Sequence, residues 1–228
     1  MLVVVLLIIF ALLAFLPSVL VNYIIKKYHS PKHLFPFSGH EYTKTLLGTL
    51  KLEHIQVIET DKGDHYDPEK KIVALSKDTF QNSSLSAITI ATHEVSHALQ
   101  HAQHYRPLVL RTRLVKLIMP LEKIGAGLLF LSPLSILITR MPILGMLIFL
   151  GGFLTLFTSI LVHAVTIPTE IDASFNKAIP LLEKSKILTQ DQLKNSKKIL
   201  LAAAFTYIAV ALRSLLDIAR WWAILRRR

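Results

Sequence analysis

The chain alternates between long apolar blocks and polar stretches, and the apolar blocks indicate how it is organised. Residues 2–21, LVVVLLIIFALLAFLPSVLV, form an almost unbroken apolar run that is long enough to cross a bilayer as a helix. No Lys or Arg precedes this run and no small-residue cleavage site follows it, which favours a membrane anchor over a cleaved signal peptide. We therefore predict an N-terminal anchor over residues 2–25.

Two further apolar blocks lie close together in the middle of the chain. The first covers residues 124–139 and contains Pro133, and the second covers residues 141–167. The second block is long enough to span a membrane with some tilt. Because only Arg140 separates the two apolar cores, they predict a helical hairpin over residues 121–167 that enters and leaves the membrane on the same side.

The last apolar block is shorter and is followed by charges. Residues 199–212 fall below the usual length of a span. Arg213, Asp217 and Arg220 follow at helical spacings that allow them to pair on one face. We interpret residues 199–225 as either a fourth span or a helix at the membrane interface.

The polar segment 26–118 has its own periodic patterns. The apolar spacing in HEYTKTLLGTLKL predicts a helix near residues 40–50. HIQVIET and KIVALS read as two strands, and the turn residues of KGDHYDPEK between them predict a short β-hairpin. A long helix follows the hairpin, with Ser83, Ser84 and Ser86 as candidate N-caps.

Composition and charge agree with a membrane protein. The 228 residues are 52% hydrophobic, the mean hydropathy is +0.49 and the formal net charge is +11. Basic residues gather after the first and third apolar blocks: Lys26, Lys27, Lys32, Lys177, Lys184, Lys186, Lys194, Lys197 and Lys198. This distribution predicts cytoplasmic polar segments and an amino terminus on the outside.

Two kinds of chemistry are excluded or disfavoured at this point. The chain has no cysteine, so thiolate metal ligands and a cysteine nucleophile are excluded. No nucleic-acid-binding motif accompanies the basic charge, so we assign that charge to membrane topology and expect no nucleic-acid partner.

The predicted long helix contains a metal-binding motif. In ITIATHEVSHALQHAQHY, the letters HEVSH match H-E-x-x-H, from His93 to His97. Two residues four apart on a helix are offset by only about 40°, so both imidazoles can converge on one zinc ion. Glu94 projects about 100° away from His93, where it can reach a water molecule rather than the metal. The apolar and small neighbours favour a zinc site over surface histidines.

His101 and His104 continue the histidine series but do not fit as ligands. One known pattern places a third histidine ten residues after the first, where this chain has Gln103. His101 and His104 lie one and two turns too far along the helix to share a metal easily with His93. We interpret them as solvated or supporting residues.

A third ligand is expected immediately after the central hairpin, because the hairpin returns the chain to the side it left. There, IPTEIDASFNKA offers Glu170 and Asp172 as carboxylate ligands. Pro168 is well suited to the first turn of a helix, which would place Glu170 early in a helix leaving the membrane. Glu170 and Asp172 differ by about 200° around a helix, so only one is expected to face the metal.

Four segments together resemble the YugP-like neutral zinc metallopeptidases of bacterial membranes, and more distantly the HtpX-type membrane proteases. They are HYDPEKKIVALS, AITIATHEVSHALQHAQHYRPLVLR, VTIPTEIDASFNKAI and ILLAAAFTYIAVAL, and the likeness covers about residues 40–215. The resemblance implies that His93 and His97 bind zinc and that Glu94 is the general base. It also implies Glu170 as third ligand, because EIDA matches the family pattern E-x-x-A.

Two residues depart from the patterns of these families. Ser96 stands where the family usually has Gly within the motif. Ser174 stands where HtpX-type proteases have an Asp four residues after the Glu ligand, although the YugP-like family shares this Ser. Asp172 then remains a supporting candidate.

The resulting fold class is a mainly α membrane protein with a small α+β zincin-like domain and a transmembrane helical hairpin. The expected parts are an N-terminal anchor (2–25), a cytoplasmic zincin-like domain (26–118), the transmembrane hairpin (121–167), a cytoplasmic helix region with the third zinc ligand (168–198) and a C-terminal helix (199–225).

The function predicted from these features is that of a gluzincin-type, zinc-dependent endopeptidase in the bacterial plasma membrane. Its active site faces the cytoplasm, with Glu94 as general base, and its substrates are polypeptides, including membrane proteins. KIVALS is either an edge strand that holds an extended substrate or a buried strand. His65 and Tyr66 are either turn residues or auxiliary hydrogen-bond donors.

Two alternatives belong to other classes of protein. One is a non-catalytic membrane scaffold, or pseudoprotease, with a structural zinc site, which the Ser96 departure leaves open although all catalytic residue types are present. The other is a metal-ion transporter, which is disfavoured because the histidines lie outside the predicted spans.

Overall fold

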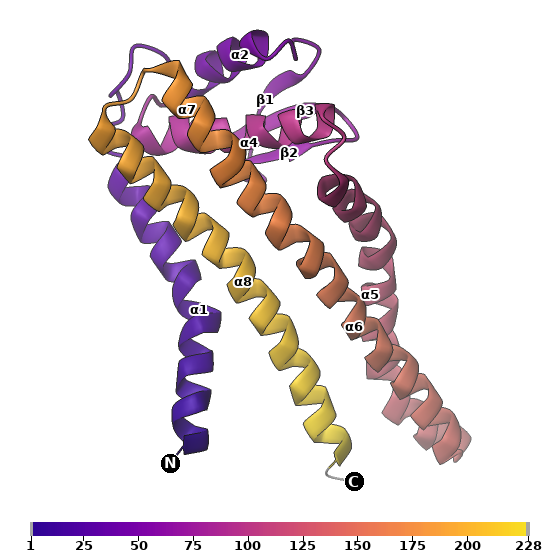
Figure 1. Ribbon diagram of the computed structural model, residues 1–228. Coiled ribbons are helices and arrows are strands. Elements are labelled where there is room, and N and C mark those ends of the chain that lie inside the picture. The colour runs from indigo at the N-terminus through magenta and orange to yellow at the C-terminus, as the bar shows by residue number, and fades with distance from the viewer. Residues whose placement is uncertain (1, 227–228) are drawn as a thin grey trace.

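The computed structural model describes residues 2–226, and in that part of the chain it is mostly helical with one small sheet (Figure 1). The helices are α1 (Leu2–Tyr28), α2 (Gly39–Thr49), α3 (Lys77–Gln81), α4 (Leu85–Ala102), α5 (Arg106–Thr139), α6 (Pro142–Ile171), the π-helix η1 (Asp172–Ala178), α7 (Ile179–Ser185) and α8 (Gln190–Arg226). The strands are β1 (Gln56–Thr60), β2 (His65–Asp67) and β3 (Ile72–Ser76).

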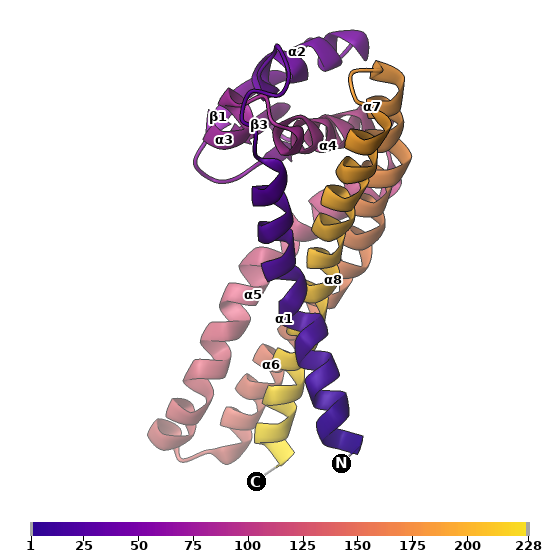
Figure 2. The same cartoon turned by 90° about the vertical axis from the view of Figure 1, so that its left-hand side faces the viewer.

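Four long helices extend from one side of a small domain that contains the sheet, α2 and α4 (Figure 1). Helix α1 packs along α8, α5 packs along α6, and α6 also contacts α8, as the two views show (Figure 1 and Figure 2). Both described chain ends and the α5–α6 turn lie at the end away from the sheet (Figure 1).

Among the described residues, three helical stretches are long and apolar enough to cross a membrane, judged by length and composition. They are Ile8–Tyr28, Arg106–Thr139 and Gln190–Ser214, and Pro142–Thr155 is a shorter apolar stretch of α6. The last apolar block, residues 199–212, is itself shorter than a span, but it lies within a helix of spanning length.

Helix α8 is attached to α1 by polar contacts at two positions along its length. Arg213 donates from Nη1 to the carbonyl oxygen of Ala14 at 2.9 Å and to Ser18 Oγ at 3.1 Å. Nearer the small domain, the Tyr28 hydroxyl donates to Asn195 Oδ1 at 3.0 Å. Arg213 thus reaches across to the neighbouring helix. The expected pairs of Arg213 with Asp217 and of Asp217 with Arg220 involve side chains outside those that the structure describes.

The helices of the central pair extend beyond the predicted hairpin at both ends. Helix α5 begins at Arg106, and α6 continues to Ile171, so both reach past residues 121–167 into the small domain. A Cβ atom at Gly152 would lie 2.7 Å from the carbonyl oxygen of Gly125, so the two backbones nearly touch there. This close packing aligns the end of α6 with the start of α5.

The sheet differs from the predicted hairpin. The strand order is β1-β3-β2, with β1 parallel to β3 and β2 antiparallel to β3. HIQVIET and KIVALS are therefore parallel neighbours, and the hairpin is formed by β2 and β3. The prediction missed β2 because its residues lie in a turn-rich stretch, in which Asp67 Oδ1 accepts the N–H groups of Glu69 and Lys70.

KIVALS is the central strand of the sheet, so its prediction as an edge strand was wrong. Its residues Val73, Ala74 and Leu75 are buried, and β3 is paired on both sides. The hydrophobic core of the small domain includes Val73 and Leu75 of this strand together with Leu47 of α2 and with Ile88 and Val95 of α4. A strand with apolar residues on both faces is expected in such a covered position.

Helix α4 passes through this core and is buried along most of its length. Ser84 is its N-cap, and the Ser84 hydroxyl accepts the N–H of Ala87 at 3.2 Å. The helix ends at Ala102, and His104 follows in the left-handed conformation with φ of 52°. His104 is therefore no longer part of the histidine face, although the sequence pattern continued it.

Pro168 does not begin a new helix, contrary to the prediction. It lies inside α6, and Glu170 is the next-to-last residue of that helix. The chain continues directly into η1, in which each N–H group bonds five residues back and the turn is wider. Proline removes one helical N–H group, yet a long helix packed on its neighbours tolerates this loss.

The close approach of α5 and α6 gives a testable prediction. Gly152→Ala should lower the free energy of unfolding by about 1–3 kcal/mol, because its Cβ would overlap backbone atoms of α5. Gly127→Ala is the matched control on the same helix pair, since a Cβ there meets nothing within 4 Å. Thermal unfolding in detergent measures the difference, and equal stability of the two variants would refute the packing described.

Candidate metal centre

Three buried side chains from two helices converge at one point of the small domain. His93 and His97 come from α4, one turn apart, and Glu170 comes from the end of α6. Glu170 Oε2 lies 3.1 Å from His93 Nε2 and 3.3 Å from His97 Nε2. One potential ligand atom from each residue lies within 4.8 Å of the others, so this group can hold a metal ion.

The donor set fits zinc. Two imidazole nitrogens and one carboxylate oxygen are the three protein ligands of many catalytic zinc sites, which leave a fourth position open. The two Nε2 atoms face Glu170, while the Nδ1 atoms on the other side of each ring have protein partners. The rings therefore already present the correct nitrogen to a shared ion.

The Glu170 carboxylate is held at both oxygens. Oε2 faces the histidines, and Oε1 accepts a hydrogen bond from Arg111 Nη1 at 2.9 Å. Burial alone would raise the pKa of Glu170, but the positive potential and hydrogen bonds of His97 and His93 outweigh it. The pKa of Glu170 is held well below its ordinary value. The carboxylate is thus ionised, as a metal ligand must be.

Asp172 lies near the site but not beside the histidines. Its carboxylate accepts hydrogen bonds from Gln100 Nε2 at 2.8 Å and from Asn176 Nδ2 at 3.1 Å. Lys177 Nζ forms an ion pair with it at 3.2 Å. Of the two carboxylates that the sequence left open, Glu170 is the one that meets His93 and His97.

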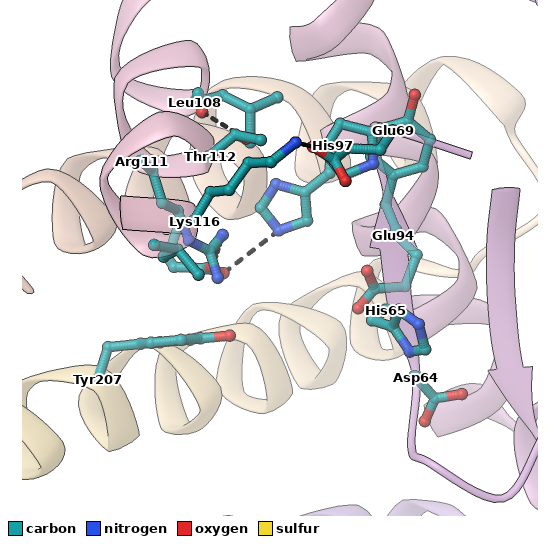
Figure 3. A pocket seen from close by; sticks show the side chains of 14 residues that line it. Asp64, His65, Glu69, Glu94, His97, Leu108, Arg111, Thr112, Lys116 and Tyr207 are labelled. Carbon is teal, nitrogen blue, oxygen red and sulfur yellow. Dashed lines mark hydrogen bonds and ion pairs between the residues drawn. The ribbon is translucent and has the colours of Figure 1, made fainter. Parts of the chain in front are cut away.

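Glu94 occupies a different position from the three converging residues. It is buried, and its carboxyl group points into a cavity that His97 also faces (Figure 3). Burial raises the pKa of Glu94 to about 7; the nearby His93 opposes this rise and the charge of Glu170 adds to it. A carboxyl group with a pKa near neutrality can both accept and return a proton.

The cavity has a volume of about 380 Å³ and is walled by several elements. Residues around β2 form one side, and the first turns of α5 and Tyr207 of α8 form the other (Figure 3). At its edge, Lys116 of α5 pairs with Glu69 of the β2–β3 turn at 2.8 Å. The site therefore lies where the small domain meets the long helices.

Sequence reasoning missed Arg111 and Tyr207 as residues of this cavity. Arg111 resembles the other basic residues that flank apolar blocks, and Tyr207 lies within an apolar block. Their spacing from the motif carries no signal, because the contacts join α5 and α8 to α4 and α6 only in the folded chain.

His101 of the motif stretch and His65 of β2 make contacts away from the three converging residues. His101 Nδ1 lies 2.8 Å from the Tyr66 hydroxyl, so it ties the end of α4 to β2. His65 lines the cavity, and its Nδ1 lies 2.8 Å from the carbonyl oxygen of Gly63. Tyr66 and His65 are thus strand residues at the cavity wall rather than simple turn residues.

Ser96 is fully buried inside α4. Its hydroxyl donates to the carbonyl oxygen of Thr92 at 2.7 Å. The hydrogen-bonding requirement of this side chain is met within its own helix, so a Ser in place of Gly leaves no unsatisfied polar group beside the metal centre.

Comparison with known proteins agrees with the resemblance seen in the sequence. Residues 3–226 match the family described as "Putative neutral zinc metallopeptidase". The chain belongs to this family of zinc metallopeptidases. No solved structure matches the chain significantly.

A curated relative extends this finding. The chain is 34% identical over 161 residues to a protein of Bacillus subtilis (strain 168) described as "Putative membrane protease YugP". The alignment covers 69% of this chain and 66% of that protein, so the chain spans just under two thirds of the length of its relative. The resemblance to YugP-like zinc metallopeptidases is confirmed.

The converging side chains give a prediction about zinc. Glu170→Ala should weaken zinc binding by more than about 100-fold, since loss of an outer partner alone costs about 10–100-fold. Glu69→Ala is the control, because Glu69 is an exposed carboxylate of the same cavity that lies apart from the histidines. Zinc content after dialysis and competition with a chelator measure both, and equal zinc affinity would exclude Glu170 as a ligand.

Proposed function

We propose that this protein is a membrane-bound, zinc-dependent endopeptidase of the gluzincin type. His93, His97 and Glu170 hold the zinc ion, and Glu94 is the general base. The observation that supports this most is the buried convergence of three ligand atoms next to a cavity into which Glu94 also points. A site with three protein ligands and an adjoining cavity leaves room for water and a substrate carbonyl group.

The side chains around the cavity have separate roles in this reaction. When bound, zinc supplies Lewis-acid chemistry that acidifies water and polarises a carbonyl group. Glu94 takes the proton from the attacking water and then delivers it to the leaving amine, for which a pKa of about 7 is well suited. Arg111 keeps Oε1 of Glu170 engaged, so that Oε2 stays directed at the histidines.

Strand β2 is the element best placed to bind an extended peptide. It is an edge strand among the described residues, because it pairs with β3 on one side only. His65 and Tyr66 of this strand line the cavity. An extended substrate can add to such an edge through backbone hydrogen bonds, which would lay the scissile bond beside Glu94.

We propose that the long helices hold this site at a bacterial plasma membrane. Three helices are of spanning length and composition, and the relative is described as a membrane protease. Lysines concentrate at the end of the helices that carries the small domain, which favours a zincin-like domain in the cytoplasm. Helices α5 and α6 then form the transmembrane hairpin. Polypeptides, including membrane proteins, are the proposed substrates.

A scaffold with a structural zinc site is the alternative of a different class. Structural zinc sites are typically closed by four protein ligands, whereas three converge here beside a cavity. A transporter is disfavoured as well, because the metal group lies in the small domain rather than midway along the long helices (Figure 1).

The role of Glu94 can be tested in the purified protein. Glu94→Gln should reduce cleavage of an unfolded protein substrate by about 10²–10⁴-fold, because the proton acceptor is lost. Zinc content should stay unchanged, since Glu94 lies outside the group of converging ligand atoms. Cleavage in detergent and zinc content are the two measurements.

An exposed glutamate serves as the control for this test. Glu53→Gln removes an exposed carboxylate and should leave cleavage unchanged. Equal cleavage by the Glu94→Gln variant and the wild type would exclude Glu94 as the base. A zinc-loaded wild type that cleaves no unfolded protein would instead favour the scaffold.

A further inference from the structure

We propose that the π-helix η1 orients both histidine ligands from behind, through Ser174 for His93 and through Asp172 and Gln100 for His97. This inference rests on the proposed zinc site and assigns positioning roles to three residues beyond it. Helix η1 begins two residues after Glu170 and packs along α4.

Gln100 has only one orientation that satisfies its surroundings. Its Nε2 lies 2.9 Å from the carbonyl oxygen of Thr169 and 2.8 Å from Asp172 Oδ2. Both of these atoms are hydrogen-bond acceptors, so the amide nitrogen must face them. The side chain is fully buried, and water cannot take the place of either partner. Oε1 of Gln100 is therefore the atom that faces His97.

The orientation of Gln100 determines the tautomer of His97. Gln100 Oε1 lies 2.9 Å from His97 Nδ1 and can only accept a hydrogen bond. Nδ1 must then carry a proton and donate it to Gln100. In the neutral ring this leaves the lone pair on Nε2, the atom that faces Glu170 at 3.3 Å. Gln100 thus presents His97 to the metal in the state that binds it.

Asp172 keeps Gln100 in this orientation and is itself held in place. Asn176 donates to Oδ1 at 3.1 Å, and Lys177 pairs with Oδ2 at 3.2 Å. Asp172, Asn176 and Lys177 all belong to η1. The Asp172 carboxylate, which the sequence offered as a rival ligand, therefore contacts Gln100, three residues beyond His97 on α4, and acts on His97 through the amide of Gln100.

Ser174 provides the corresponding contact for His93. Its hydroxyl lies 3.3 Å from His93 Nδ1, and the side chain is fully buried. A hydroxyl can accept a hydrogen bond from Nδ1–H, which leaves Nε2 directed at Glu170. The longer distance makes this contact weaker than that of Gln100 with His97.

The π-helical turn explains how one segment can contact both the His93 ring and Gln100, the partner of His97. In an ideal α-helix, residues two apart point in directions about 200° apart, which separates Asp172 from Glu170 and Ser174. The wider register of η1 changes these directions, and the segment contacts α4 at both His93 and Gln100. Such π-helical turns are frequent at functional sites.

The test measures metal binding, which is independent of peptidase activity. Gln100→Met removes the amide while keeping the length of the side chain, and it should weaken zinc affinity by about 10–100-fold. The absorption spectrum of the cobalt-substituted full-length protein in detergent should shift, because one imidazole is no longer fixed. Gln103→Met, at the exposed C-cap of α4, is the matched control and should change neither measurement.

A charge-conserving exchange tests the chain from Asp172 to His97. Gln100→Glu alone places two carboxylates face to face and should bind zinc more weakly than Gln100→Met. In the Gln100→Glu/Asp172→Asn double variant, the new amide can donate to the new carboxylate, which can still accept from His97 Nδ1. Zinc affinity of the double variant should therefore recover above that of the Gln100→Glu single variant.

Each outcome decides the proposal. Wild-type zinc affinity and cobalt spectrum in Gln100→Met would overturn it, as would a double variant no better than Gln100→Glu. Should Gln100→Met fail to fold, Ser174→Ala, which removes one hydroxyl, must still weaken zinc binding, by less than 10-fold. A wild-type protein that binds no zinc would overturn the proposed function as well. Normal zinc binding without cleavage would overturn only the peptidase proposal.

Discussion

A single buried carboxylate links three helices of this protein. Glu170 lies at the end of α6, meets His93 and His97 of α4, and is held at its other oxygen by Arg111 of α5. An ionised group in such a place is costly unless it is paired on every side. The arrangement of these helices therefore follows from one electrostatic requirement, and a metal ion would satisfy it further.

Helix α4 is buried although it carries many polar residues, so these side chains also need hydrogen-bond partners. The Thr89 hydroxyl lies 2.8 Å from the Ser196 hydroxyl of α8, and the hydroxyls of Thr92 and Ser96 bond to carbonyl oxygens one turn back. A buried polar network is stable only when its members are satisfied. These bonds allow α4 to pass through the core and fix its position against α8.

The long helices form part of the candidate site. The first turns of α5 and Tyr207 of α8 form walls of the cavity that Glu94 faces. The close backbone packing of α5 on α6 brings Arg111 and Glu170 together from positions 59 residues apart. The candidate site is therefore shared between the small domain and the long helices, and under the proposed function an anchor cannot be separated from an independent catalytic domain.

What the sequence determined by itself is local. Helical spacing places His93 and His97 on one face, apolar length indicates the long helices, and the Ser84 cap marks the start of α4. Other features depended on contacts between distant segments. Strand β2 is recognised only by its pairing with β3, and the choice of Glu170 over Asp172 depends on how the end of α6 packs against α4, 77 residues after His93. Sequence periodicity reports the neighbours of a residue on its own helix or strand, whereas the partners of a buried carboxylate are chosen by packing between elements.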